Sequence, residues 1–347
     1  MSNDRSQRGY FPYFDYLRIS LASIVMLGHD HVITWHASGA LAVQIFFALS
    51  GWLIGGILLD LNVRDLPRFY MNRAARIWIP YYIALFLLLA VSLLKDQPSL
   101  KWFEFLIYKA SFVYDIFGPP QLAEYRSFMP LQGTGNHFWS VNAEEQFYLV
   151  APLLLVVAAS SLGRRVATWA ALSLVAWWAN FYASIVFGVF AAIVVRQYGP
   201  IHQSPVIRAA LVCGVAATGI GLAYEFNFWS LAPVLSICAV LFFAAKGEQR
   251  PFGKFVGGIS YPLYLNHWIG VFVGNFVLSP FGLRDSPARQ AVSILINIAV
   301  ASALYWYVDR RMLALRGTLY SEARAKNIMF AAYGMVILGL FFGFLVR

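Results

Sequence analysis

Long apolar stretches recur along the whole chain, and short charged clusters separate them. A stretch of about 20 apolar residues is long enough to cross a bilayer as one α-helix. On this criterion the sequence predicts an all-α fold, a single domain over residues 1–347 and eleven membrane-spanning helices. The predicted spans lie at residues 14–34, 38–60, 76–95, 137–160, 165–179, 181–197, 206–225, 229–246, 258–281, 288–313 and 327–346.

Two regions fit this pattern less well. The predicted helices at 165–179 and 181–197 are short and almost touch. The segment 101–117 is apolar but carries four charged residues, so we expect it to lie in the interface or to re-enter the membrane. The loop 101–136 is therefore a candidate lid over an active site.

The composition also indicates a membrane protein. Of the 347 residues, 60% are hydrophobic and 12% are charged, whereas a soluble domain carries about 25% charged residues. The net charge of +10 does not indicate nucleic-acid binding, because the basic residues lie in the loops between apolar stretches. Cys213 and Cys238 lie inside apolar stretches without metal-ligand spacing, so we interpret both as core residues and expect no metal site.

The basic residues also predict an orientation. Arg5 and Arg8 precede the first predicted span, the cluster from Arg64 to Arg76 follows the second, and Arg310 and Arg311 lie in the last turn of the tenth. Cytoplasmic loops of membrane proteins are enriched in Lys and Arg. We therefore expect a cytoplasmic N-terminus, with all of these clusters on the cytoplasmic side.

The first predicted span contains ionisable residues, which are costly within a membrane and mark functional candidates. Asp15 and Arg18 are three residues apart, so they either form a functional ion pair or simply reach the cytoplasmic interface. Arg18 and His29 share a helix face, about three turns and 16 Å apart. We interpret His29 as a proton-transfer group, because imidazole titrates near neutral pH.

The fourth predicted span opens with a polar motif. His137 and Glu144 share one face of the helix, while Glu145 points about 100° away from Glu144. Counting the helical rise puts Glu144 about 20 Å from the inner face, and His29 about 22 Å from it. The two side chains are therefore predicted to lie at the same depth. The candidate residues of this motif are His137, Trp139, Ser140, Glu144, Glu145 and Tyr148.

Two further places carry candidate chemistry. Arg73 and Arg76 are three residues apart at the start of the third predicted span. They either determine the topology or clamp a phosphate with forked hydrogen bonds. His267 lies near the middle of the ninth predicted span, as either a functional group or a hydrogen-bonded packing residue.

Taken together, these motifs resemble the acyltransferase-3 family of membrane acyltransferases, in the family's order and over most of the chain. The matching segments are Asp15-x-x-Arg18 followed after ten residues by His29, Phe46 to Ile54, Arg73 to Pro80, His137 to Tyr148, and Ser260 to His267. Asn72 stands where the family often has another Arg, and Trp52 and Val141 replace the commoner Phe and Leu.

The resemblance implies a ten-helix core at about residues 10–315 and an extra span at 327–346. In some members an outer esterase-like domain follows that span, but the sequence ends at Arg347, so we expect none here. It also implies a bacterial inner-membrane enzyme in contact with membrane lipid. Its donor would be acyl-CoA, usually acetyl-CoA, and its acceptor a hydroxyl of a cell-surface or lipid-linked carbohydrate.

The family's essential Arg and His map onto Arg18 and His29, its basic loop onto Arg73 and Arg76, and its carboxylate onto Glu144. We hypothesise that His29 takes the acceptor's proton while Glu144 orients His29 or stabilises its charged form. The rise between Arg18 and His29, about 16 Å, is comparable to the length of a pantetheine arm. Because no G-x-S-x-G motif is present, direct transfer is favoured over an acyl-enzyme.

Two other functions remain open at this point. A secondary transporter with an intramembrane His/Glu proton relay would also bury such groups. A non-catalytic partner in a glycan export complex is the other alternative. The sequence shows no internal repeat of the kind that many transporters have, and the ordered motifs favour the enzyme.

Overall fold

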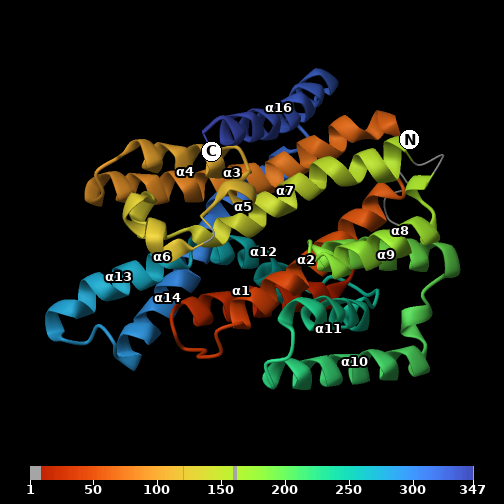
Figure 1. The fold of residues 1–347 in the computed structure, drawn as a ribbon, viewed down its shortest axis with the longest axis horizontal. Helices are drawn as coiled ribbons and strands as arrows, with labels where there is room; N and C mark the ends of the chain where they lie inside the picture. The colour runs from red at the N-terminus through yellow and green to blue at the C-terminus, as the bar shows by residue number, and fades with distance from the viewer. Residues whose placement is uncertain (1–8, 120, 159–161, 347) are drawn as a thin grey trace. The chain divides into compact units, whose positions relative to one another are not determined.

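The computed structural model describes residues 9–119, 121–158 and 162–346, and these residues form helices and no β-strand (Figure 1). The all-α prediction is confirmed. Arg5 and Arg8, which support the predicted orientation, lie outside the described residues. The α-helices are α1 (Pro12–His29), α2 (Ser38–Leu58), α3 (Leu66–Lys95), α4 (Leu100–Ala110), α5 (Tyr114–Phe117), α6 (Leu122–Tyr125), α7 (Trp139–Pro152), α8 (Val166–Trp178), α9 (Ala183–Tyr198), α10 (Pro205–Ala223), α11 (Phe228–Phe243), α12 (Pro251–Asn266), α13 (Trp268–Leu278), α14 (Pro287–Leu304), α15 (Arg310–Leu315) and α16 (Glu322–Val346).

Most predicted spans coincide with observed helices. Among the described residues, five helices are long and apolar enough to cross a membrane, namely Ser38–Leu58, Val63–Lys95, Pro205–Ala223, Pro287–Leu315 and Glu322–Val346. The helices α8, α9, α11 and α13 are shorter but also apolar. The structure is therefore that of a multi-pass membrane helix bundle.

Some predicted spans differ clearly from the observed helices. The first span ends at His29 instead of residue 34, because the chain turns there and His31 takes a positive φ of 58°. The third helix begins at Leu66 instead of residue 76, with Pro67 in its first turn, where the missing N–H costs nothing. The ninth span is broken at His267, which separates α12 from α13.

The segment 101–117 does not form a spanning helix. The eleven residues of α4 cover about 16 Å, roughly half of the hydrocarbon core. Phe112, at a positive φ of 57°, then interrupts the helix before α5. The segment is thus too short to span as one helix, and its place in the interface or as a re-entrant segment stays a prediction.

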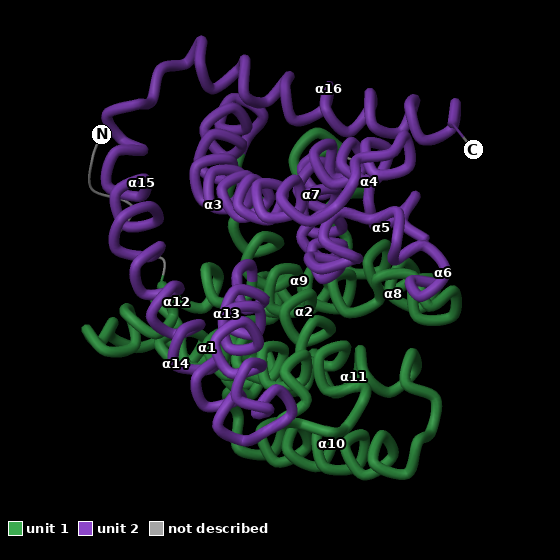
Figure 2. The backbone as a smooth tube through the Cα atoms, turned by 90° about the vertical axis from the view of Figure 1, so that its left-hand side faces the viewer, with its two compact units in different colours: residues 1–61, 153–264 green, residues 62–152, 265–347 purple. Residues whose placement is uncertain are grey.

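The described chain divides into two compact units (Figure 2). Residues 1–61 and 153–264 form unit 1, and residues 62–152 and 265–347 form unit 2. In unit 1, α2 packs against α1, α9 and α11, and α10 lies alongside α11 (Figure 1).

Glycine allows α2 and α9 to approach very closely. A Cβ atom added to Gly51 would lie 2.1 Å from the carbonyl oxygen of Ile185, and one added to Gly188 would lie 2.2 Å from that of Ala48. Small residues at such crossings allow the backbone contact that drives helix association in lipid. Gln44 and Ser184 add a hydrogen bond between the same helices.

In unit 2, α3 packs against α16, and α13 packs against α14. Tyr333 of α16 connects two helices, because its hydroxyl hydrogen-bonds Tyr70 of α3 at 2.8 Å and donates to the carbonyl of Leu149 of α7 at 2.9 Å. These contacts fix α3 and α7, which carry most of the candidate residues of this unit.

Candidate active site

In unit 1, the candidate residues lie on α1, which is one continuous helix from Pro12 to His29. Its continuity confirms that Arg18 and His29 share a face, about 16 Å apart. The expected ion pair is present, with 3.4 Å between Arg18 Nη1 and Asp15 Oδ1.

Asp15 is held from several sides. It is 7% exposed, and the hydroxyl of Tyr10 donates a hydrogen bond to its second carboxylate oxygen. Gly257 of α12 lies directly against it, since a Cβ atom there would be 2.5 Å from Asp15 Oδ1. Asp15 is thus part of the helix packing and does not simply reach for the membrane interface.

His29 is the last residue of α1, and its side chain is exposed. The C-terminal end of a helix carries partial negative charge from its unpaired carbonyl groups. Those carbonyl groups contribute a favourable interaction with a positively charged imidazole, whereas the neighbouring His31 acts against the positive charge. Asp30, the next residue, is buried and caps the helix through its backbone N–H.

In unit 2, Glu144 of α7 is surrounded by Tyr148 and Arg73. The Tyr148 hydroxyl donates a hydrogen bond to Glu144 Oε1. The Arg73 guanidinium of α3 lies 5.9 Å from the centre of the Tyr148 ring and interacts electrostatically with Glu144. These three side chains form one charged cluster between α3 and α7.

This cluster corrects the predicted depths. The sequence placed Arg73 at the inner face and Glu144 about 20 Å from that face, whereas the structure makes them neighbours. Because α3 already begins at Leu66, Arg73 belongs to the helix and does not lie in a loop before it. A phosphate at Arg73 would therefore meet the Glu144 carboxylate as well.

Glu145 has a separate environment from Glu144. It is 3% exposed and accepts a hydrogen bond from Trp78 Nε1 at 2.7 Å. Its other carboxylate oxygen is buried and has no hydrogen-bond partner among the described residues. The two adjacent carboxylates are thus held differently by the same pair of helices.

His137 and His267 lie together in unit 2. Their ring centres are 4.5 Å apart, and both side chains are buried. His137 Nε2 is 3.2 Å from the carbonyl oxygen of Leu265, and Ser140 Oγ donates to the His137 carbonyl at 3.1 Å. Trp139, the first residue of α7, lies between His137 and Ser140 in the sequence and is half-buried.

Arg76, the second residue of the predicted clamp, is exposed. It interacts electrostatically with Asp309, which follows α14 in a π-helical turn at Tyr305–Asp309. Arg73 and Arg76 therefore each have an acidic neighbour in this unit.

Sequence reasoning missed a buried hydrogen-bond network around Asn142. Asn142 is fully buried, donates to the Tyr81 hydroxyl at 3.0 Å and accepts from the Tyr114 backbone N–H at 3.0 Å. The Tyr81 hydroxyl donates in turn to the Lys109 carbonyl at 2.9 Å. An Asn near the start of a predicted spanning helix was the available signal, because buried amides need partners.

These helices and polar clusters define a multi-pass membrane protein with charged groups held between its helices. The acyltransferase domain family matches residues 11–306 of this chain. The chain therefore belongs to that family and carries a membrane acyltransferase domain. No solved structure matches it.

Several curated relatives resemble part of the chain. The peptidoglycan O-acetyltransferase OatA of Listeria monocytogenes is 30% identical over 172 residues, which is 44% of this chain and 25% of OatA. YrhL of Bacillus subtilis, provisionally a peptidoglycan O-acetyltransferase, is 30% identical over 185 residues, which is 48% of this chain and 27% of YrhL. The matches cover about a quarter of these relatives' length.

Proposed function

We propose that this protein transfers an acyl group, in particular acetyl, from cytoplasmic acyl-CoA to a hydroxyl of a cell-surface or lipid-linked carbohydrate. The family match and the O-acetyltransferase relatives support acyl transfer to a carbohydrate. The observation that carries the proposal is the continuous helix α1, with Arg18 and His29 on one face inside the matched segment.

In the proposed reaction, His29 removes the proton from the acceptor hydroxyl as its oxygen attacks the thioester carbonyl. The carbon–sulfur bond then breaks, and the protonated His29 returns the proton to the departing CoA thiolate. An ester and free CoA are the products. The end of α1 supports the charged imidazole between these two proton transfers.

Arg73 and Arg76 are the proposed contacts for the donor's phosphates. Arg76 is the more accessible of the two, while Arg73 is half-buried beside Glu144. Arg18 is proposed to fix Asp15 or to contact the donor's polar arm.

The pairing of Glu144 with His29 stays a prediction from the sequence. Tyr148 gives the Glu144 carboxylate a fixed orientation, which suits a group that positions another residue. If the two residues act as a unit, replacing both with Ala should reduce the rate no further than either single replacement. Independent losses that multiply would reject the pairing.

The activity itself is tested by measuring ester-linked acetate, released by mild base from the surface carbohydrate of cells that express the chain. We expect His29→Ala and Glu144→Ala to abolish this acetate while the protein stays in the membrane. His36→Ala is the matched control, because His36 is exposed and lies outside α1. Full acetylation by the His29→Ala protein would reject His29 as the base.

A further inference from the structure

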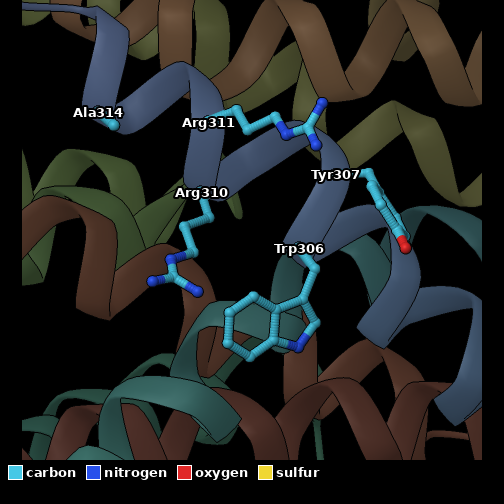
Figure 3. A pocket seen from close by; sticks show the side chains of 5 residues that line it. All are labelled: Trp306, Tyr307, Arg310, Arg311 and Ala314. Carbon is cyan, nitrogen blue, oxygen red and sulfur yellow. The ribbon is translucent and has the colours of Figure 1, made fainter.

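A hollow of about 430 Å³ lies beyond the end of α14 in unit 2. It is lined by Trp306, Tyr307, Arg310, Arg311 and Ala314 (Figure 3). Small-molecule sites in proteins typically enclose about 300–1,000 Å³. All of these residues except Trp306 follow the family match, which ends at residue 306.

Each arginine of the hollow is paired with an aromatic ring one turn earlier. The Arg310 guanidinium carbon lies 4.3 Å from the centre of the Trp306 ring, and that of Arg311 lies 5.5 Å from the Tyr307 ring. Figure 3 shows Arg310 extending beside Trp306 and Arg311 toward Tyr307. Such cation–π contacts limit the rotamers of both arginines.

The backbone supports this arrangement. Residues Tyr305–Asp309 form a π-helical turn between α14 and α15. Single π-helical turns inside α-helices occur frequently at functional sites. Here the turn carries both aromatic residues, and the two arginines follow it directly.

Neither guanidinium is engaged by another protein group within the described part of the chain. No ion pair or hydrogen bond of Arg310 or Arg311 is formed there. Asp309, the adjacent carboxylate, does not line the hollow and interacts with Arg76 instead. Ten N–H donors, five on each arginine, are thus available to a ligand.

Guanidinium groups with free N–H edges match the geometry of phosphate oxygens. The aromatic residues suit a position at the membrane–water interface, where Trp and Tyr are enriched. The sequence places this end of α14 on the cytoplasmic side, where phosphates of both lipids and nucleotides are available.

We propose that this hollow binds a phosphate group, presented either by an anionic phospholipid headgroup or by the nucleotide end of acyl-CoA. The second source rests on the proposed acyl transfer, whereas the first does not. The experiment therefore measures binding directly and leaves catalysis aside.

The test compares the wild type with the double variant Arg310→Gln/Arg311→Gln, both as full chains. In nanodiscs of phosphatidylcholine alone, the affinities for CoA and for dephospho-CoA, which lacks the 3′-phosphate, are measured. In a second arm, the phosphatidylglycerol retained after purification from mixed vesicles is quantified. Arg208→Gln/Arg316→Gln is the control, because it removes two charges on the same predicted side, one of them also over an aromatic ring at 4.7 Å.

A loss of about tenfold in CoA affinity, confined to the Arg310/Arg311 variant, would support the nucleotide source, since a charged hydrogen bond contributes about one such factor. Loss of retained phosphatidylglycerol with unchanged CoA affinity would support the lipid source. The proposal is overturned if neither the CoA affinity nor the retained phosphatidylglycerol changes. It is also overturned if the Arg208/Arg316 control loses as much of either as the Arg310/Arg311 variant. A wild type that binds no CoA would count against the proposed donor, while the lipid arm still decides the hollow.

Discussion

Lys109 offers a sharp test of the structure, because it is a buried cation without a carboxylate partner. It is fully buried at the end of α4, and its Nζ donates to the Gly135 carbonyl at 2.9 Å. Nζ also lies 3.6 Å from the centre of the Tyr114 ring and 5.7 Å from that of Phe138. It forms no ion pair with the residues that the structure describes. Burial lowers the pKa of Lys109 from 10.5 to about 7.

That change in pKa sets the size of the expected effect. It corresponds to a cost of about 5 kcal/mol for keeping the charged ammonium in this environment. The variant Lys109→Met removes the charge but also the hydrogen bond to Gly135, and an unpaired buried carbonyl costs about 1–3 kcal/mol. At pH 7 or below, the variant should therefore be more stable than the wild type, by about 2–4 kcal/mol.

The pH dependence gives a second check with a definite sign. The native pKa is the lower one, so between about pH 7 and 10.5 the unfolded chain binds more protons than the native chain. The stability of the wild type should therefore rise with pH in this window, and Lys109→Met should lack this rise. Near pH 10 the order of the two proteins should reverse, because only the lost hydrogen bond then remains.

The measurement is the unfolding temperature in detergent at pH 6.5, 8 and 9.5, at one heating rate. Lys101→Met is the control, since Lys101 is exposed on the same helix and pairs with Glu104 at 2.7 Å. We expect its unfolding temperature to differ from that of the wild type by a small amount that is the same at every pH. The reasoning would be refuted if Lys109→Met unfolded at a lower temperature than the wild type at pH 6.5. It would also be refuted if the two unfolding temperatures differed by the same amount at every pH.

Two further predictions concern the packing and the site. Gly188→Ala should destabilise unit 1 by about 1–3 kcal/mol, because the new Cβ atom would lie 2.2 Å from the Ala48 carbonyl oxygen. Gly56→Ala, where no atom lies within 4 Å, should not lower the unfolding temperature, and equal effects of the two would contradict this account. Tyr148→Phe removes the hydrogen bond to Glu144, so acetate transfer should fall about tenfold at unchanged protein level if Glu144 acts in the reaction. An unchanged rate would show that this hydrogen bond is not needed.

The sequence was sufficient for the apolar helices and for contacts within one helix. Spans were found because hydropathy averages over a long window, and the Asp15–Arg18 pair was found because helical spacing determines it. Helix ends were harder. The third span was started at residue 76 because the charges before it suggested a loop, yet α3 runs unbroken from Leu66. A hydropathy criterion leaves the charged residues at the end of a spanning helix out of the predicted span, although these residues continue the helix.

Contacts between distant segments could not be predicted from spacing. The neighbours His137 and His267 are separated by a long stretch of chain, and only packing brings their rings to 4.5 Å. The burial of Lys109 could not be predicted from the segment 101–117 alone, because it depends on the turn at Gly135, whose carbonyl accepts its hydrogen bond. In both cases the surroundings of a polar side chain are formed by a segment distant in the sequence, so the local sequence does not determine them.

The cluster on α3 and α7 changes how a phosphate clamp at Arg73 and Arg76 has to work. Arg73 interacts electrostatically with Glu144, and Arg76 with Asp309, so each of these arginines has a carboxylate near it before any ligand arrives. An incoming phosphate would have to compete with these carboxylates, which weakens binding at the pair alone. Arg310 and Arg311 have no such competitor within the described residues and follow Asp309 directly in the chain. A phosphate therefore meets less competition from carboxylates at Arg310 and Arg311, directly after the π-helical turn, than at Arg73 and Arg76.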